Sequence, residues 1–526
     1  MMSSNRKLPI GIQDFEDLRT NGYLYVDKTA YIYQLATTGK PYFLGRPRRF
    51  GKSLFLSTLK AYFLGKKELF DGLAISGLEK KWVKYPVIYI DFNKAVYTDV
   101  KTLHVVLDNI LQKYEAEWQI TNIAERLSVR FDNLIQEMYN KTGCKAVVLV
   151  DEYDKPLLGT MDNLEVNDEI RTVLKGFYGV LKSSDAFLRF VFLTGVTKFS
   201  KVSVFSDLNQ LQDISMKKQY AGICGITQTE LIKNFRPEIT ALAEKQKLTY
   251  EETLAELKKH YDGYHFAKES DDIYNPFSVL NTFSDSDFNN YWFETGTPTF
   301  LIKMLKDIDF NLKSLENDVQ IPADLITDYQ AGSGNPVPLL YQSGYLTVKK
   351  YDKEFNEYTL GFPNNEVKYG FIKRLIPAYM SGREMSGDFS TGNFIRDLRA
   401  GNTDGFMTRL QSFFSSIPYE LNNKEEKHYQ TVFYLLFKLM GQFVQTEVSS
   451  AVGRADAVVV VDDAVYIFEF KLTGNATAEE ALKQIDERKY AAGYAVGGKK
   501  IVKVGAEFNA EERTLHRWCV ENGRTF

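Results

Sequence analysis

A glycine-rich, basic loop is the first segment of the sequence that could do chemistry. The segment Gly45-Arg-Pro-Arg-Arg-Phe-Gly51-Lys52-Ser53 follows a short apolar run and precedes a helical pattern at 54–63. Backbone N–H groups at the start of a helix can cradle a polyphosphate. A following lysine can reach the β- and γ-phosphates, and a serine hydroxyl can ligate Mg²⁺. We therefore expect Gly45, Gly51, Lys52 and Ser53 to bind ATP and Mg²⁺, with Ser53 as a metal ligand.

The spacing of this loop departs from the usual G-x-x-x-x-G-K-[ST] pattern. Gly45 and Gly51 are six positions apart, and Phe50 stands where a small residue is expected. The pattern therefore indicates a longer or differently shaped loop. Arg48 and Arg49, together with Arg46, add positive charge that could contact phosphate in this chain or in a neighbouring subunit. The alternative is a surface turn with a basic face.

A second acidic motif follows an apolar strand about 100 residues downstream. The run Val147-Val-Leu-Val150 leads into Asp151-Glu152-Tyr153-Asp154. In this arrangement Asp151 would be a ligand of the bound Mg²⁺, and Glu152 would polarise the water that attacks the phosphate. The alternative is a buried strand whose acidic residues begin a solvated loop. The next apolar run ends at Thr194, which we expect to sense the γ-phosphate, although a strand-ending Thr-Gly pair is also typical of a plain turn.

A separate group of charged residues lies near the C-terminus. Asp456 begins one strand of an expected β-hairpin, and Glu469 and Lys471 lie in the other strand, 464–472. Because strand side chains alternate between faces, Glu469 and Lys471 project together while Phe468 and Phe470 pack on the other face. Two carboxylates and an ammonium group suit phosphodiester cleavage assisted by Mg²⁺ or Mn²⁺, with Asp456 and Glu469 as metal ligands. The alternative is an edge strand whose Glu469 and Lys471 pair in solvent.

The elements that must position these residues predict an α/β fold. Short apolar runs at 41–44, 86–91, 146–151 and 190–194 alternate with helical patterns, which indicates a parallel sheet covered by helices. Residues 226–260 predict a helical lid. His260 and His265 follow, and a structural aromatic turn explains them better than a metal site. A short helix at 337–343 with a two-stranded hairpin resembles a winged helix, which we expect to pack against the rest of the chain rather than to bind DNA.

Length and composition set the outer limits. At roughly 150 residues per domain, 526 residues suggest more than one domain, and we place the boundaries at 1–225, 226–385 and 386–526. A formal net charge of −3 excludes a broadly basic nucleic-acid binder. The three cysteines support neither a disulfide framework nor a zinc cluster. No signal peptide or membrane-spanning stretch is evident, so we expect a cytoplasmic protein with no membrane partner.

Several strings along the first 300 residues together resemble the bacterial AAA-ATPase-like family. They are Leu8-Pro-Ile-Gly11, Tyr25-Val-Asp27-Lys28, the loop 46–53, Asp151-Glu-Tyr-Asp154, Tyr261-Asp-Gly-Tyr-His265, Tyr274-Asn-Pro-Phe277 and residues 292–300. The resemblance implies a P-loop ATPase domain and includes the irregular loop spacing. ATPases of this class often complete a site with a neighbour's arginine, so a homo-oligomer is an expectation, and Arg46 and Arg189 are the candidates.

Residues 395–520 resemble the PD-(D/E)XK nuclease superfamily. Asp456, Glu469 and Lys471 match its signature, and Gln484 with Tyr490 matches a Q-x-x-x-x-x-Y pattern on the following helix, 478–490. The resemblance implies catalytic roles for Asp456, Glu469, Lys471 and Gln484. It also implies an acidic residue on the first helix of the domain, for which Glu425 and Glu426 are equal candidates. An ordinary polar helix position remains the alternative for Gln484.

The two sites together favour an ATPase coupled to a metal-dependent nuclease that acts on nucleic acid, with DNA as the expected substrate. A second hypothesis is a nucleotide-switched binding or signalling module with an inactive nuclease-like domain. A third is a nuclease whose P-loop domain serves as a scaffold and binds no nucleotide.

Overall fold

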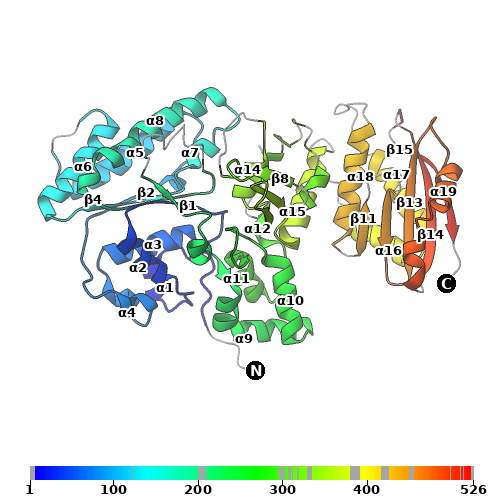
Figure 1. The fold of residues 1–526 in the computed structure, drawn as a ribbon, viewed down its shortest axis with the longest axis horizontal. Coiled ribbons are helices and arrows are strands. Elements are labelled where there is room, and N and C mark those ends of the chain that lie inside the picture. The colour runs from blue at the N-terminus through cyan, green and yellow to red at the C-terminus, as the bar shows by residue number, and fades with distance from the viewer. Residues whose placement is uncertain are drawn as a thin grey trace. The chain divides into compact units, whose positions relative to one another are not determined.

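The computed structural model describes most of the chain. The described residues are 6–121, 124–198, 208, 210–294, 301–302, 304–305, 308, 310, 312–316, 319–327, 334–379, 391–415, 426–442, 444–448, 455–497, 499–509, 511–512 and 514–522. The chain forms two compact units, residues 1–296 with 314–367 and residues 297–313 with 368–526. Each unit is described by itself (Figure 1). The phosphate loop and most of the middle region share the first unit, so the predicted boundary near 225 stays a prediction.

A five-stranded parallel sheet forms the centre of the first unit, as the sequence predicts. Its strands are β1 (Pro41–Gly45), β2 (Val87–Asp91), β3 (Ala146–Asp151), β4 (Leu188–Gly195) and β5 (Gln212–Asp213), in the order β2-β3-β4-β1-β5. All six residues of β3 are buried, as expected for the middle of a parallel sheet covered on both faces. The register pairs Asp91 with Asp151 and Leu44 with Thr194. The carboxyl ends of the strands therefore meet at one edge of the sheet.

Helices cover both faces of this sheet (Figure 1). On one face lie α5 (Val100–Glu117), α6 (Leu127–Thr142) and α8 (Leu164–Ser183), and on the other α1 (Phe15–Thr20), α2 (Thr29–Thr38), α3 (Lys52–Phe63) and α4 (Ala74–Leu78). The short α7 (Lys155–Leu158) follows β3 directly. Local signals explain the ends of these helices. Asp99 caps α5 by accepting from the N–H of Thr102 at 2.8 Å, and Gly143, with φ 67°, ends α6.

The helices predicted at 226–260 are present as α9 (Gln228–Gln246) and α10 (Tyr250–Tyr261), and α11 (Pro276–Asp285) and α12 (Tyr291–Glu294) extend this helical lid beyond the predicted range. A short two-stranded sheet, β6 (Ile226–Thr227) with β7 (Ile273–Tyr274), closes its base. Capping boxes begin α9 at Thr227 and α10 at Thr249. Apolar side chains of α9, α10 and α11, including Leu231, Leu257 and Val279, form one buried core.

The two lid histidines have structural partners. His260 Nδ1 lies 2.9 Å from the carbonyl of Glu256, and its ring packs near Phe288. His265 Nδ1 lies 3.1 Å from Asp272. Within the described residues, no cluster of three or more His, Cys, Asp or Glu side chains is arranged to hold a metal ion. These contacts agree with the structural interpretation of both histidines.

The predicted helix and hairpin of the middle region are present as α14 (Val337–Gln342), β9 (Thr347–Asp352) and β10 (Glu357–Gly361), and β8 (Val319–Pro322) adds a third strand in the order β8-β10-β9. This element packs on the rest of the first unit, as expected. Gln342 Oε1 accepts from the N–H of Lys198 at 2.7 Å, and Thr347 Oγ1 accepts from the N–H of His265 at 2.7 Å. The following helix, α15 (Asn365–Tyr379), begins in the first unit and ends in the second.

The second unit contains a mixed five-stranded sheet. Its strands are β11 (Gln445–Val448), β12 (Ala457–Val460), β13 (Ala464–Leu472), β14 (Lys500–Asn509) and β15 (Thr514–Asn522), in that order. Only the β13–β14 pair is parallel. Its helices are α16 (Thr391–Arg399), α17 (Thr403–Ser415), α18 (Glu426–Met440) and α19 (Ala478–Glu487). This α/β architecture agrees with the fold class expected for the C-terminal region.

Alternation along β13 assigns its side chains to two faces. Ile467 packs in a core with Ile485 of α19. Phe468 faces the opposite side, where its ring lies 5.4 Å from that of Phe437 on α18. The same two-residue alternation places Glu469 and Lys471 on the face of the sheet that α19 covers and Phe470 on the opposite face.

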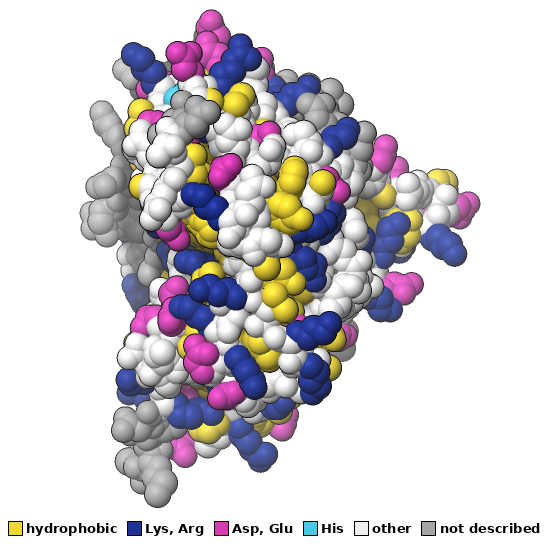
Figure 2. All heavy atoms as spheres, turned by 90° about the vertical axis from the view of Figure 1, so that its left-hand side faces the viewer, with side chains coloured by type: hydrophobic (Ala, Val, Ile, Leu, Met, Phe, Trp, Pro, Cys, Tyr) yellow, Lys and Arg dark blue, Asp and Glu magenta, His cyan; other side chains and the backbone are white. Residues whose placement is uncertain are grey.

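The molecular surface has no uniform charge on the face shown in Figure 2, where lysines and arginines are interspersed with acidic and apolar side chains. The mixture of charges on this face agrees with the small net charge of the chain. Within the part of the chain that the structure describes, no helix combines the length and apolar character needed to cross a bilayer.

Candidate nucleotide site and candidate nuclease site

The phosphate loop joins β1 to α3, and the middle region determines its unusual shape. Gly51 occupies the N-cap of α3 with φ 90°, a left-handed conformation that glycine adopts without strain. The ring of Phe50 is buried and packs edge-on against those of Tyr264 and Phe266. Trp292 Nε1 donates to the carbonyl of Arg48 at 3.2 Å. The bulky side chain and extra residue of this loop are therefore accommodated by contacts with the lid.

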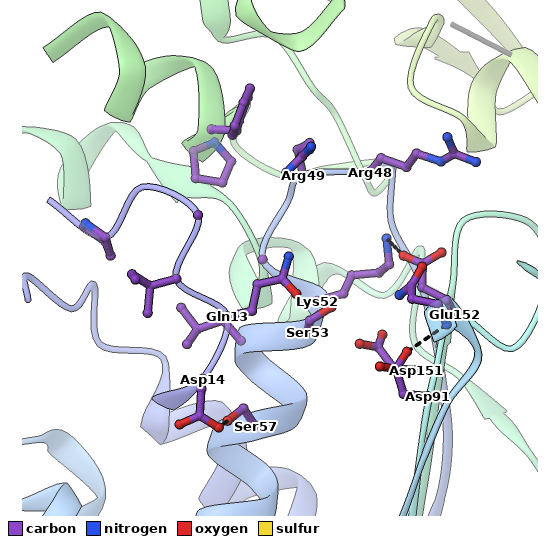
Figure 3. A pocket seen from close by; sticks show the side chains of 18 of the residues that line it. Gln13, Asp14, Arg48, Arg49, Lys52, Ser53, Ser57, Asp91, Asp151 and Glu152 are labelled. Atoms are coloured by element: carbon purple, nitrogen blue, oxygen red, sulfur yellow. Dashed lines mark hydrogen bonds and ion pairs between the residues drawn. The ribbon is translucent and has the colours of Figure 1, made fainter. Parts of the chain in front are cut away.

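Lys52 is buried at the start of α3, with 4% of its surface exposed. Its ammonium group donates to the carbonyls of Arg46 at 3.1 Å and Pro47 at 3.2 Å, and it pairs with Glu152 Oε1 at 3.2 Å (Figure 3). Burial raises the pKa of Glu152, but the positive charges of Lys52, Arg48 and Lys155 outweigh this and lower it below its usual value. Glu152 is therefore held ionised beside the phosphate loop.

Asp151 ends β3 and lines the same pocket as Ser53. Thr194 Oγ1 donates to Asp151 Oδ1 at 2.7 Å. Burial raises the pKa of Asp151 above its usual value. A hydroxyl and a carboxylate oxygen side by side at a phosphate loop are the oxygen ligands that Mg²⁺ prefers, so Ser53 and Asp151 fit the predicted metal role.

Asp154 fixes the turn that carries Glu152. Its Oδ2 accepts from the N–H groups of Val196 at 2.9 Å and Thr197 at 2.6 Å. The hydroxyl of Tyr153 donates to the carbonyl of Thr197 at 2.8 Å. Burial and the neighbouring Glu152 raise the pKa of Asp154 to about 7. The last two residues of the motif thus connect the end of β3 to the loop after β4.

A pocket of about 620 Å³ opens beside the loop (Figure 3). The predicted residues that line it are Arg48, Arg49, Gly51, Lys52, Ser53, Asp151 and Glu152. An apolar chamber of about 90 Å³ adjoins this pocket. Five residues line both cavities, and they are Pro9, Gly51, Leu54, Pro276 and Leu280. The arrangement provides a polar end for phosphates and an apolar end for a flat ring.

Sequence reasoning missed part of the wall of this pocket. This part of the wall is formed by residues 9–14, Asp91, Asn93, Lys155, and Pro276, Phe277, Leu280 and Asn281 of α11. Asp91 could have been found, because it ends a strand next to the one that carries Asp151. The strings at 8–11 and 274–277 were noticed for their resemblance to the family but were given no role.

Two predicted nucleotide ligands lie away from the pocket. Gly45 is the last residue of β1, and its N–H donates to Ser215 Oγ at 2.8 Å. Thr194 is fully buried behind Asp151, so it contacts the metal-ligand candidate rather than the cavity. Neither residue is among those that line the pocket, because the backbone turns away from the sheet edge only after Gly45.

The two guesses for an arginine that reaches a neighbouring site are not supported. Arg46 is buried, stacks on Phe266 at 4.1 Å and donates to the carbonyls of Ser215 at 2.7 Å and Tyr220 at 3.0 Å. Arg189 donates to the carbonyl of Ala36 at 2.8 Å. Both side chains are held by their own subunit.

In the second unit, the predicted nuclease residues converge between β13 and α19. Lys471 Nζ donates to Glu469 Oε1 at 3.0 Å and to Gln484 Oε1 at 2.7 Å. Gln484 Nε2 donates to Glu469 Oε1 and lies 3.4 Å from the hydroxyl of Tyr490. Asp456 Oδ2 accepts from the N–H of Phe470 at 2.8 Å, which places it across the hairpin from Glu469. Gln484 is thus part of a hydrogen-bonded group, not an isolated helix position.

The donor set of this cluster fits a divalent cation. Glu469 is 3% exposed, and its Oε2 has no hydrogen-bond partner among the described residues. Burial, with a contribution from Asp456, raises the pKa of Glu469. An unpaired buried carboxylate oxygen beside a second carboxylate is expected where a cation binds, with water and substrate oxygens completing its shell. Glu425 and the side chain of Glu426 lie outside the described part, so the choice between the two glutamates stays open.

Comparison with known proteins agrees with both sites. A family model described as "Predicted AAA-ATPase" matches residues 9–205, and one described as "PD-(D/E)XK nuclease superfamily" matches residues 424–518. The chain is 38% identical over 527 residues to the "Uncharacterized protein in vnfD 5'region" of Azotobacter chroococcum mcd 1, with 99% of each chain covered. The chain therefore belongs to the AAA-ATPase-like family and carries a C-terminal domain of the PD-(D/E)XK nuclease superfamily.

Proposed function

We propose that this protein is an ATPase coupled to a metal-dependent nuclease that cleaves phosphodiester bonds in DNA. The observation that carries the proposal is the nuclease cluster, in which Lys471 bonds both Glu469 and Gln484 while Glu469 Oε2 stays unpaired. A surface ion pair would leave both groups in solvent, whereas this carboxylate is buried and one of its oxygens has no partner among the described residues, which is unfavourable unless a ligand binds there.

The nucleotide pocket supports the ATPase half. Phosphates of ATP would compete with Glu152 for the Lys52 ammonium group, which now lies 3.2 Å from Glu152 Oε1. Breaking this ion pair frees Glu152 to accept a proton from the attacking water. The adenine ring of ATP would enter the apolar chamber between the segment that contains Pro9 and the helix that contains Pro276. Mg²⁺ bound through Ser53 and Asp151 would neutralise phosphate charge.

The nuclease half uses the three bonded side chains in distinct ways. A cation held by Asp456 and Glu469 would polarise the scissile phosphate. Lys471 is oriented by Glu469 and Gln484, so its ammonium group can orient water and offset phosphate charge. Gln484 keeps the lysine in place through its amide oxygen.

The test is cleavage of linear and circular, single- and double-stranded DNA, and of RNA, with Mg²⁺ or Mn²⁺ and with or without ATP. Lys471→Ala should abolish cleavage of the DNA, and Lys52→Ala should remove its dependence on ATP. Glu521→Gln is a matched control, since Glu521 is an exposed carboxylate of the same unit that pairs with Lys503. Cleavage that survives Lys471→Ala, or a preference for RNA, would contradict the proposal.

A nucleotide-switched binding module is the second candidate. The Lys52–Glu152 ion pair favours it, because this contact withholds the base from water in the form described. This candidate predicts slow or absent ATP hydrolysis and nucleic-acid binding that is indifferent to Glu469→Ala. Measured dissociation constants for labelled DNA, with and without ATP, separate the two functions.

A further inference from the structure

Three cations of the same chain surround Glu152, and only one of them has an ion-pair partner among the described residues. Lys52 pairs with Glu152. Arg48 and Lys155 also line the pocket, yet neither forms a salt bridge within the described part of the chain. We propose that Arg48 and Lys155 contact the γ-phosphate in cis, so that this ATPase site completes its own charge and needs no arginine from a neighbouring subunit. The proposal rests on the ATPase function given above.

The backbone of Arg48 is anchored at the phosphate end of the pocket, which its side chain lines. Its carbonyl accepts from Trp292 Nε1 at 3.2 Å, which anchors the backbone of the loop. Its neighbour Arg49 instead lies 4.7 Å from the ring of Phe277, on the wall formed by α11. Figure 3 shows the two arginines leaving the loop in different directions, with Arg48 on the side of Glu152. Arg48 therefore lines the same side of the pocket as the general-base candidate, with no ion pair to another described residue.

Lys155 is positioned by the turn that also positions Glu152. It is the first residue of α7, and its N–H donates to the carbonyl of Glu152 at 2.9 Å. Asp154 holds this turn through its bonds to the two amide groups after β4. Glu152 and Lys155 therefore leave the backbone from one hydrogen-bonded turn at the edge of the pocket. The positive charges of Arg48 and Lys155 lower the pKa of Glu152, which agrees with the place of both residues beside it in the pocket.

The chemistry explains why these charges matter. Water attacks the γ-phosphorus, its proton passes to the Glu152 carboxylate, and the bond between the γ-phosphorus and the bridging oxygen breaks with its electron pair going to ADP. Negative charge spreads over the γ-phosphate oxygens and the leaving oxygen in the transition state. Cations that contact these oxygens lower the barrier more than they strengthen ATP binding. Lys52, Arg48 and Lys155 can provide all of this charge from one chain.

The first test separates turnover from binding in the full-length protein. Arg48→Ala and Lys155→Ala should each lower kcat by about 10²-fold or more, while the dissociation constant for a fluorescent ATP analogue changes only a few-fold. Lys218→Ala is the control, because this exposed lysine of the same unit pairs with Glu269 and does not line the pocket, so its kcat should stay near that of the wild type. Retained analogue binding also shows that each variant is folded.

The second test asks whether Arg48 acts within its own chain. Arg48→Ala is mixed with Glu152→Gln, a variant that lacks the base but supplies an intact Arg48. A cis arginine predicts no recovery of hydrolysis on mixing and a specific activity that does not depend on protein concentration. Recovery on mixing would overturn the proposal, as would an unchanged kcat in both Arg48→Ala and Lys155→Ala.

The outcomes also distinguish this inference from the proposed function. If the wild type does not hydrolyse ATP, or if Lys52→Ala and Glu152→Gln hydrolyse it normally, the ATPase function fails and the inference fails with it. If those two variants are inactive but Arg48→Ala and Lys155→Ala turn over normally, only the inference fails.

Discussion

The substitution Glu469→Gln should affect stability and activity of the nuclease domain in opposite directions. Glu469 is 3% exposed, its Oε2 has no partner among the described residues, and Asp456 adds like charge beside it. A glutamine keeps an oxygen acceptor for Lys471 and presents an N–H₂ donor toward Asp456 in place of the unpaired oxygen. Leaving a buried polar atom unsatisfied costs about 1–3 kcal/mol, so we expect the metal-free variant to be more stable than the wild type by about 1 kcal/mol or more.

The same substitution should remove the stabilisation that a divalent cation gives. A site with a dissociation constant of about 1 mM gains about 1.4 kcal/mol from 10 mM Mg²⁺. Calorimetric unfolding with EDTA and with Mg²⁺ measures both effects on the full-length protein. The wild type should show a higher midpoint with Mg²⁺, whereas Glu469→Gln should start higher and respond little, with DNA cleavage reduced at least about 100-fold. Glu521→Gln controls for removal of an exposed carboxylate and should retain the response to Mg²⁺.

Two results would refute this reasoning. If Glu469→Gln lowers the metal-free stability, the ion pair of Glu469 with Lys471 outweighs the cost of the unpaired oxygen. If the variant keeps the full response to Mg²⁺, the cation binds elsewhere, and the unpaired oxygen does not mark its site.

Three further substitutions test particular contacts. Trp292→Phe removes the donor to the Arg48 carbonyl, and at about 1 kcal/mol for a hydrogen bond it should weaken binding of a fluorescent ATP analogue about fivefold in an equilibrium titration. Asp154→Ala leaves two buried amide N–H groups without their acceptor, so urea unfolding should show a loss of about 2–5 kcal/mol, and a loss below 1 kcal/mol would contradict the role given to this turn. Burial raises the pKa of Asp262 to about 6, so the native state holds its proton more tightly than the unfolded chain, whose aspartate pKa is about 3.9. The contribution of Asp262 to stability is present below about pH 4 and is lost as the pH rises through about 6. The wild type should therefore lose stability relative to Asp262→Asn between pH 4 and pH 7, so that the thermal midpoint of the variant rises relative to that of the wild type. A difference in midpoint that stays constant over this range would contradict the argument.

The sequence predicts the sheet and the residues at its edge well, because these signals are local. The predicted run 146–151 coincides with β3, and the alternation along β13 places Glu469 and Lys471 on the face that α19 covers. A buried parallel strand reads as a continuous apolar run, and a polar residue at its end must leave the core. Both rules need only neighbouring residues, so a single sequence suffices to apply them.

The walls of the nucleotide pocket could not be predicted in the same way. Segments 9–14 and 276–281 meet there although more than 250 positions separate them, and nothing local in either segment specifies the meeting. Gly45 and Arg46 illustrate the same limit. Gly45 matches the first glycine of the motif and Arg46 follows it, but Gly45 ends β1 and Arg46 is buried against the ring of Phe266. Residue type indicates what a side chain can do, and tertiary packing decides whether it is at the site.

The irregular spacing of the phosphate loop shows how these two levels combine. Compared with the usual pattern, the loop is one residue longer and contains Phe50, which by itself weakens the case for nucleotide binding. In the fold, Phe50 fills a space between Tyr264 and Phe266, and Gly344 lets Pro47 approach so closely that an added Cβ would lie 2.7 Å from it. The lid and the hairpin thus replace contacts that a shorter loop would make within itself. The end of the loop, Gly51-Lys52-Ser53, consequently begins α3 beside Asp151 and Glu152, where the phosphates of a nucleotide require it.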